Sequence, residues 1–207
     1  MDNKETLRAI ISSLENKAYN DYEAGKQAEY DKFWDNLQNN GNRFGYFRAF
    51  TEMGWNANNF KPKYPITCYA KQSYHTNNAE CIFHTSDIVS IDVPIIVTGL
   101  PMTSTFAGCD LLETISLLEV NGVTSFSTAF VTCRALKNIT FAGSIDVSID
   151  FSATEVLTDA SVQSIIDHLK DLTGATAQKL TFHATVGGKL TEAQKATITS
   201  KNWTLVY

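Results

Sequence analysis

The sequence predicts an α+β fold built from a long N-terminal helix, an aromatic-rich connector and a short repeat solenoid with a parallel β-sheet along one side. Three observations lead to this prediction. The first forty residues have helical periodicity, a motif of about two dozen residues recurs from residue 82 onward, and the chain ends in two helix–strand units. The expected domains are 1–42, 43–66 and 67–207, and the last of these includes a C-terminal cap.

The N-terminal segment lacks proline between residues 3 and 40 and carries apolar residues at spacings of mostly three and four. This pattern predicts one long helix whose apolar stripe is too thin for it to be stable alone. The helix either folds back on the solenoid or associates with copies of itself in a bundle. The expected oligomerisation residues are Leu7, Ile11, Leu14, Ala18, Tyr22 and Phe33.

The connector is rich in aromatic residues, ten of which lie between Tyr30 and Tyr64. Two interpretations remain open. The rings cover the first repeat as an N-terminal cap, or Trp and Tyr form an exposed platform for a sugar or another ligand.

The repeat is clearest in two stretches, residues 103–117 and 127–141, which match at a spacing of 24 residues. Each copy ends in a short apolar–polar alternation such as Ile115-Ser116-Leu117, which predicts one strand per copy and a parallel sheet when copies stack. A more degenerate copy lies 24 residues earlier, at Ile82, Thr85, Ile88 and Ile91. The predicted inward ladder of the two clear copies is Phe106, Cys109, Leu112 and Ile115 with Phe130, Cys133, Leu136 and Ile139.

The cysteines on this ladder, Cys109 and Cys133, have no His or Lys at a fixed offset that would lower a thiol pKa. We therefore interpret them as small buried hydrophobes rather than as a reactive pair. A disulfide between Cys68 and Cys81 is an open alternative to two free thiols, since a reducing compartment disfavours it.

The C-terminal third predicts a helix within residues 158–174, with Asp159 and Ser161 as capping candidates, followed by a strand at 179–183. A second helix begins at the capping box of Thr191 and Gln194, and a strand follows at 203–207. Leu180 and Phe182 are expected to correspond to Trp203 and Leu205, and Trp203 with Tyr207 to form the C-terminal cap.

Catalytic and metal sites are not expected. The four histidines, His75, His84, His168 and His183, lack metal-ligand spacing, and no nucleophile elbow, phosphate loop or dinucleotide fingerprint occurs. Asp146, Asp150 and Glu155 form an acidic patch that we interpret as a solvated strand face, the alternative being a hard-cation or glycosidase site. The sequence therefore predicts a protein that is not an enzyme and uses no cofactor.

The net charge of −5, from 22 acidic and 17 basic residues, comes without a basic stripe, which argues against nucleic-acid and anionic-membrane partners. The first residues lack the apolar core of a signal peptide, and no stretch approaches a membrane span. We expect no membrane insertion and no export by the general secretory route.

The copies "FAGCDLLETISL" and "FVTCRALKNITF" resemble BspA-like leucine-rich repeats, in which an aromatic residue, a Cys, a Leu and an Ile lead into the strand. The connector and the C-terminal segments look like a subtype found in bacteriophages and prophages of gut Firmicutes, often among tail genes. The resemblance implies a non-enzymatic virion component, such as a tail-fibre or receptor-binding protein, that is attached through its N-terminal helix. It implies as partners further copies of the chain, other virion proteins, and a host-surface protein or glycan. An intracellular inhibitor of a host protein and a bacterial surface adhesin are alternatives that use the same solenoid.

Overall fold

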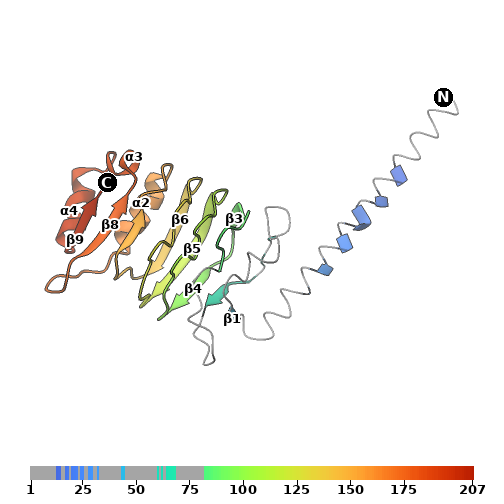
Figure 1. The fold of residues 1–207 in the computed structure, drawn as a ribbon, viewed down its shortest axis with the longest axis horizontal. Coiled ribbons are helices and arrows are strands. Elements are labelled where there is room, and N and C mark those ends of the chain that lie inside the picture. The colour runs from blue at the N-terminus through green and yellow to red at the C-terminus, as the bar shows by residue number, and fades with distance from the viewer. Residues whose placement is uncertain are drawn as a thin grey trace. The chain divides into compact units, whose positions relative to one another are not determined.

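The computed structural model of the chain describes residues 82–207, residues 64–68, Phe60, Pro62, Arg43, Phe44 and scattered positions from 13 to 32. The chain divides into two compact units, Met1–Asn40 and Gly41–Tyr207. The second unit is a mixed α/β fold with parallel sheets and a few helices (Figure 1). Within the described residues, no helix is both long enough and apolar enough to span a bilayer.

The first unit is described only in part. Its described residues between Ser13 and Lys32 have helical backbone and exposed side chains, and Lys17 forms an ion pair with Asp21 at 2.8 Å. Of the predicted oligomerisation residues, Leu14, Ala18 and Tyr22 are exposed. Leu7, Ile11 and Phe33 lie outside the described residues.

The first sheet of the second unit is parallel and is built around β5 (Thr114–Asn121), the longest described strand. Because β5 is long, it pairs with two short strands on one side and with one strand on the other. The other strands of this sheet are β1 (Arg43–Phe44), β2 (Ile66–Cys68), β3 (Ser90–Ile91), β4 (Ile95–Thr98) and β6 (Asn138–Gly143).

The register of this sheet follows the sequence repeat at first and then shifts. Ile91, Ile115 and Ile139 are direct neighbours on β3, β5 and β6, and each is at most 1% exposed. Beyond Ile115 a bulge in β5 brings Leu118 opposite Phe141. The predicted alternation was therefore wrong at Leu117, which is half-buried, because the extra residue of the bulge turns Leu118 inward in its place.

Phenylalanine side chains form a continuous buried column through the second unit. Phe83 stacks on Phe106 at 5.3 Å between ring centroids, and Phe106 stacks on Phe130 at 5.4 Å. The column continues through Phe151 and Phe182, so that it passes under the coils of the early repeats and into the strands of the second sheet. We call Phe83, Phe106, Phe130, Phe151 and Phe182 the phenylalanine column.

The column corrects the register predicted for the earliest copy. Phe83 and Ser86, rather than Ile82 and Thr85, stand opposite Phe106 and Cys109. The spacing is 23 residues there and returns to 24 at Ile91, because stacking of the rings fixes the alignment and one residue fewer follows Ser86. Ile82 and Ile88 are nevertheless fully buried, whereas Thr85 is exposed.

A second parallel sheet was not expected as a separate element. It consists of β7 (Ile149–Phe151), β8 (Gln178–Phe182) and β9 (Trp203–Val206) in that order. In Figure 1 it follows the first sheet toward the C-terminus. Leu180 pairs with Leu205, so the predicted correspondence at a spacing of 23 was wrong; the observed spacing is 25, because the short helix α3 (Ala184–Gly187) lengthens the connection between β8 and β9.

The two C-terminal helices are α2 (Asp159–Asp167) and α4 (Glu192–Ser200). The capping box of Thr191 and Gln194 is confirmed, but the N-cap of α2 is Thr158 rather than Asp159 or Ser161. Helix α2 also ends well before Gly174, because Leu169 pairs with Ile145 in an extended bridge. Trp203 is 3% exposed and donates from Nε1 to the Lys170 carbonyl at 2.9 Å, whereas Tyr207 is 52% exposed.

Serine side chains of α2 close the edge of the first sheet. The Ile139 N–H donates to Ser161 Oγ, and the Phe141 N–H donates to Ser164 Oγ, both at 2.9 Å. These N–H groups of β6 would otherwise need the carbonyls of a further strand. Helix α2 therefore replaces a strand at this position, and the sheet stops at β6.

Candidate functional site

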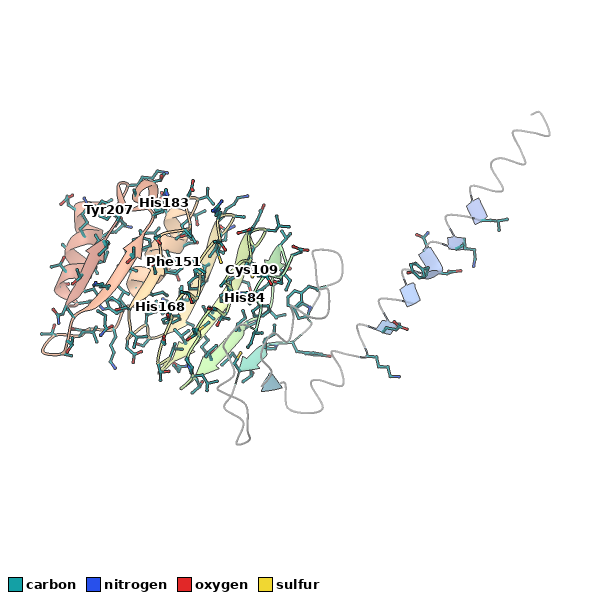
Figure 2. All side chains as sticks on the ribbon, viewed as in Figure 1. His84, Cys109, Phe151, His168, His183 and Tyr207 are labelled. Carbon is teal, nitrogen blue, oxygen red and sulfur yellow. The ribbon has the colours of Figure 1, made fainter. Side chains whose placement is uncertain are left out.

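The described histidines have separate surroundings (Figure 2). The ring Nδ1 of His168 lies 2.8 Å from the Ser164 carbonyl, at the end of α2. His183 accepts the Thr185 N–H at 3.2 Å and caps α3. No group of three His, Cys, Asp or Glu residues in the described part of the chain is placed to hold a metal ion, and His75 lies outside that part.

The acidic patch does not form one site. Asp146 pairs with Lys170 at 3.4 Å, while Asp150 accepts the Ser152 N–H at 2.7 Å and so closes a turn. Glu155 lies 3.9 Å from His183. Since each carboxylate has a different partner on a different segment, the three side chains do not converge on one ion or substrate.

The ladder cysteines are buried, and their thiols bond to the backbone. Cys109 Sγ donates to the Phe83 carbonyl at 2.8 Å, and Cys133 Sγ donates to the Phe106 carbonyl at 3.0 Å. Burial raises the pKa of both thiols well above the ordinary value, which holds them in the protonated, weakly nucleophilic form. Cys68 is also a buried free thiol, so it is not bridged, and Cys81 lies outside the described residues.

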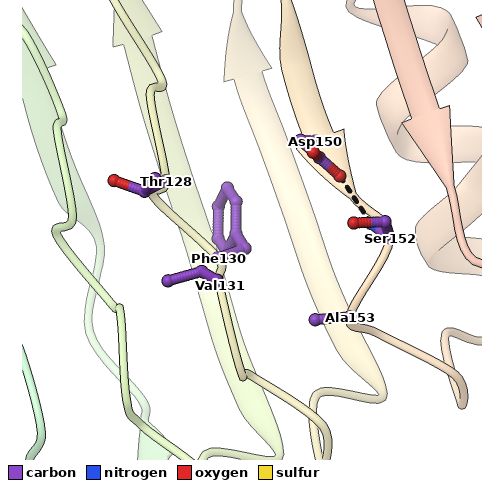
Figure 3. Close-up of a pocket in the computed structure, with 6 residues that line it drawn as sticks. All are labelled: Thr128, Phe130, Val131, Asp150, Ser152 and Ala153. Carbon is purple, nitrogen blue, oxygen red and sulfur yellow. Dashed lines mark hydrogen bonds between the residues drawn. The ribbon is translucent and has the colours of Figure 1, made fainter.

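A small hollow opens between the coil before Cys133 and the turn after β7 (Figure 3). Its volume is about 80 Å³, well below the roughly 300 Å³ at which ligand pockets usually begin. Thr128, Asp150 and Ser152 supply its polar atoms, and Asp150 is already committed to Ser152. The hollow therefore has neither the size nor the polar groups to bind and orient a substrate.

A larger groove of about 220 Å³ lies between the N-termini of α2 and α4. Leu157, Val162, Val186 and Leu190 form its apolar floor, and each is less than a tenth exposed. The charged and polar side chains around this floor are Asp159, Lys189, Thr191 and Gln194. We refer to these eight residues as the groove.

Comparisons with protein families, with curated proteins and with solved structures find no match for the chain. The site must therefore be argued from the geometry of the described residues alone.

The predicted ladder residues share one environment. Backbone hydrogen bonds join equivalent positions of successive copies, from Glu113 N to the Val89 carbonyl at 2.8 Å and from Lys137 N to the Glu113 carbonyl at 2.9 Å. Thr158 N then donates to the Lys137 carbonyl at 2.9 Å, which places the N-cap of α2 in the same series. The ladder residues Ile82, Ile88, Ile91, Phe106, Cys109, Leu112, Ile115, Phe130, Cys133, Leu136 and Ile139 are all at most 1% exposed.

Counting from this series identifies exposed positions that are equivalent but chemically different. Asp110, Arg134 and Glu155 occupy one such position, and all three are exposed. Leu111, Ala135 and Val156 occupy the next; Leu111 is 52% and Val156 46% exposed. At a further position Glu113 and Lys137 form an ion pair at 3.0 Å.

The sequence interpretation missed the fourth copy and with it the groove. A signal was present, because the motif Phe-x-x followed by Ser, Cys or Thr occurs at Phe83, Phe106, Phe130, Phe151 and Phe182. Its spacings vary with the inserted helices, so a search at a fixed period of 24 residues passes over the last two copies.

Proposed function

We propose that the chain is a non-enzymatic binding protein in which stacked repeats form a short solenoid of the leucine-rich-repeat kind. The observation that supports this proposal is the contrast between inward and outward positions. Equivalent inward positions keep Phe, Leu and Ile, whereas the equivalent outward position holds Asp110, Arg134 and Glu155 in turn. A regular frame with varied exposed side chains suits recognition of a partner, and the thiols and carboxylates that sequence reasoning considered for chemistry have structural partners instead.

The setting that we propose is a bacteriophage particle, with the solenoid displayed as part of a tail or receptor-binding structure. The resemblance of the repeats and the connector to phage-type proteins supports this setting. The N-terminal segment would join copies of the chain or attach them to other virion proteins. Leu14, Ala18 and Tyr22 are exposed, as an oligomerisation stripe requires.

Purified phage particles from a bacterium that encodes the chain test the setting. Quantitative mass spectrometry across a density gradient should find the chain at a fixed ratio to the particle. If the chain is found only in the host cytosol, bound one-to-one to a host protein, it is the intracellular module instead. If it is found only on the bacterial surface, it is an adhesin.

Light scattering on the full chain tests the role of the N-terminal segment. We expect an oligomer, and we expect the double variant Leu14→Glu, Ala18→Glu to be a monomer, because two charges on the stripe would prevent helix packing. A wild-type monomer would contradict the proposed self-association.

A further inference from the structure

The groove is a consequence of the change from strands to helices. Neighbouring strands lie about 4.8 Å apart, whereas packed helices lie about 8–10 Å apart. Beyond β6 the limb of each repeat is a helix, so the copies that carry Thr158 and Thr191 are farther apart on this side than those that carry Glu113 and Lys137. Gln194 reaches from α4 to Gln163 of α2 at 3.1 Å, and the space between Leu157 and Leu190 remains open as the groove.

An exposed apolar stripe leads to the groove along the turns that enter β5, β6 and α2. It consists of Leu111, Ala135 and Val156, which are equivalent in three successive copies. Val156 is followed directly by Leu157 of the groove floor. In Figure 1 these turns and α3 lie on the same edge of the unit, at the top of the view.

We propose that the stripe and the groove together bind an amphipathic α-helix of a partner protein, with one apolar side chain of that helix inserted into the groove. This inference rests on the proposed binding function and names its surface. One turn of a helix rises 5.4 Å, close to the strand spacing of about 4.8 Å, so apolar residues three or four apart meet Leu111, Ala135 and Val156 in turn. The small side chain of Ala135 leaves room there for a large partner residue.

The size of the groove also favours a side chain over a free small molecule. Its volume of about 220 Å³ is below the range of roughly 300–1,000 Å³ for small-molecule pockets. A leucine or phenylalanine on a helix would fill much of it and would be covered by the apolar floor. Such an anchored apolar residue beside a polar border is the usual arrangement at the centre of a helix-binding surface.

Charges beside the stripe define which helix fits. Asp110, Arg134 and Glu155 run parallel to the stripe and alternate in sign, and all three are exposed. Across the stripe, Glu113 and Lys137 already neutralise each other at 3.0 Å. The partner helix should therefore carry a basic, an acidic and a basic residue along one flank of its apolar row.

The test uses a labelled synthetic helix of about 18 residues, which spans roughly 27 Å. It has Leu at every third and fourth position and a Lys-Glu-Lys flank; a control peptide of the same composition has the reversed Glu-Lys-Glu flank. We expect fluorescence anisotropy with the full-length protein to show at least about tenfold tighter binding of the first peptide. Equal binding of the two peptides, or no binding of either, overturns the proposal.

Two protein variants locate the binding. Val156→Asp should weaken binding by about tenfold or more, whereas Val131→Asp, at a side chain of similar exposure that lines the hollow of Figure 3, should leave it unchanged. Equal loss in both variants overturns the proposal. Should Val156→Asp fail to fold, Arg134→Glu decides: it should weaken the Lys-Glu-Lys peptide and recover affinity when the glutamate of the peptide is changed to lysine.

The remaining outcomes separate this inference from the proposed function. If Val156→Asp changes the mass of the protein alone in sedimentation, the stripe binds a second copy and the helix proposal is wrong. If the chain co-purifies with phage particles but ignores the peptide, only the helix proposal fails. If the peptide binds as expected and the chain is absent from particles, only the virion setting fails.

Discussion

Glycine is required at residue 143 for two separate reasons. Its φ is +79°, and a Cβ built there would lie 2.1 Å from the Val120 carbonyl oxygen of the neighbouring strand. Gly122 has a similar φ of +64°, but a Cβ there would meet nothing within 4 Å. The pair therefore separates backbone strain from steric contact.

We expect Gly122→Ala to lower the free energy of unfolding by about 1–2 kcal/mol, the cost of a left-handed alanine. Gly143→Ala should lower it by a further 1–3 kcal/mol or so, because the backbone of β5 must move. Urea unfolding followed by circular dichroism measures both. Equal losses in the two variants would mean that the strands separate without cost at this point.

The Cys68 thiol makes stability depend on pH in the alkaline range. Burial raises its pKa from 9.0 to about 12. Above about pH 9 the unfolded chain loses this proton while the folded chain keeps it, so the free energy of unfolding falls as the pH rises. The contribution is complete below pH 9 and is lost between about 9 and 12, at about 1.4 kcal/mol per pH unit.

The measurement compares wild type with Cys68→Ala by urea unfolding from pH 7 to pH 11. The difference between their free energies of unfolding should be constant up to about pH 9 and should then shift steadily in favour of the variant. A constant difference up to pH 11 would show that Cys68 ionises in the folded protein as readily as in the unfolded one.

At the scale of elements, α2 does the work of a strand through two side chains. Ser164→Ala should leave the Phe141 N–H without its acceptor in a half-buried place. We expect a loss of about 1–3 kcal/mol and faster hydrogen exchange at Phe141 than in wild type. Ser200→Ala is the control, because Ser200 is exposed at the end of α4 and bonds only within its own helix. Unchanged exchange at Phe141 would show that Ser164 does not close the sheet edge.

The elements could be predicted where local chemistry fixes them. The capping box at Thr191 and the inward isoleucines of three strands are such cases, because both patterns depend on residues close in sequence. The bulge after Ile115 and the early end of α2 could not be predicted. They depend on Phe141 and on the Ile145–Leu169 bridge, which are contacts between different copies.

The groove lay beyond sequence reasoning for a related reason. Its floor combines Leu157 and Val162 with Val186 and Leu190, which lie on two copies separated by a whole strand. Each residue alone has the pattern of an ordinary core position. Only the wider spacing of helices, set against the closer spacing of strands, leaves them facing an open space.

At the scale of the whole second unit, the phenylalanine column joins the two sheets. Phe151 is its central member: it stacks on Phe130 at 4.7 Å and on Phe182 at 6.1 Å, and it meets Phe141 of β6 edge-on at 6.4 Å. Phe106 is equally buried but contacts only rings of the repeats beside the first sheet. Removing either ring should cost about 3–5 kcal/mol.

The two variants should differ in how that loss is distributed. Phe106→Ala should lower protection from hydrogen exchange across the unit while unfolding remains a single transition, because the connection between the sheets is intact. Phe151→Ala should lower protection in β7, β8 and β9 more than in β5, because the second sheet then loses its ring contacts with the first. Hydrogen-exchange mass spectrometry on the peptides that contain β5 and β9 measures the contrast. Parallel losses in β5 and β9 for both variants would show that α2 and the backbone, rather than the column, hold the two sheets together.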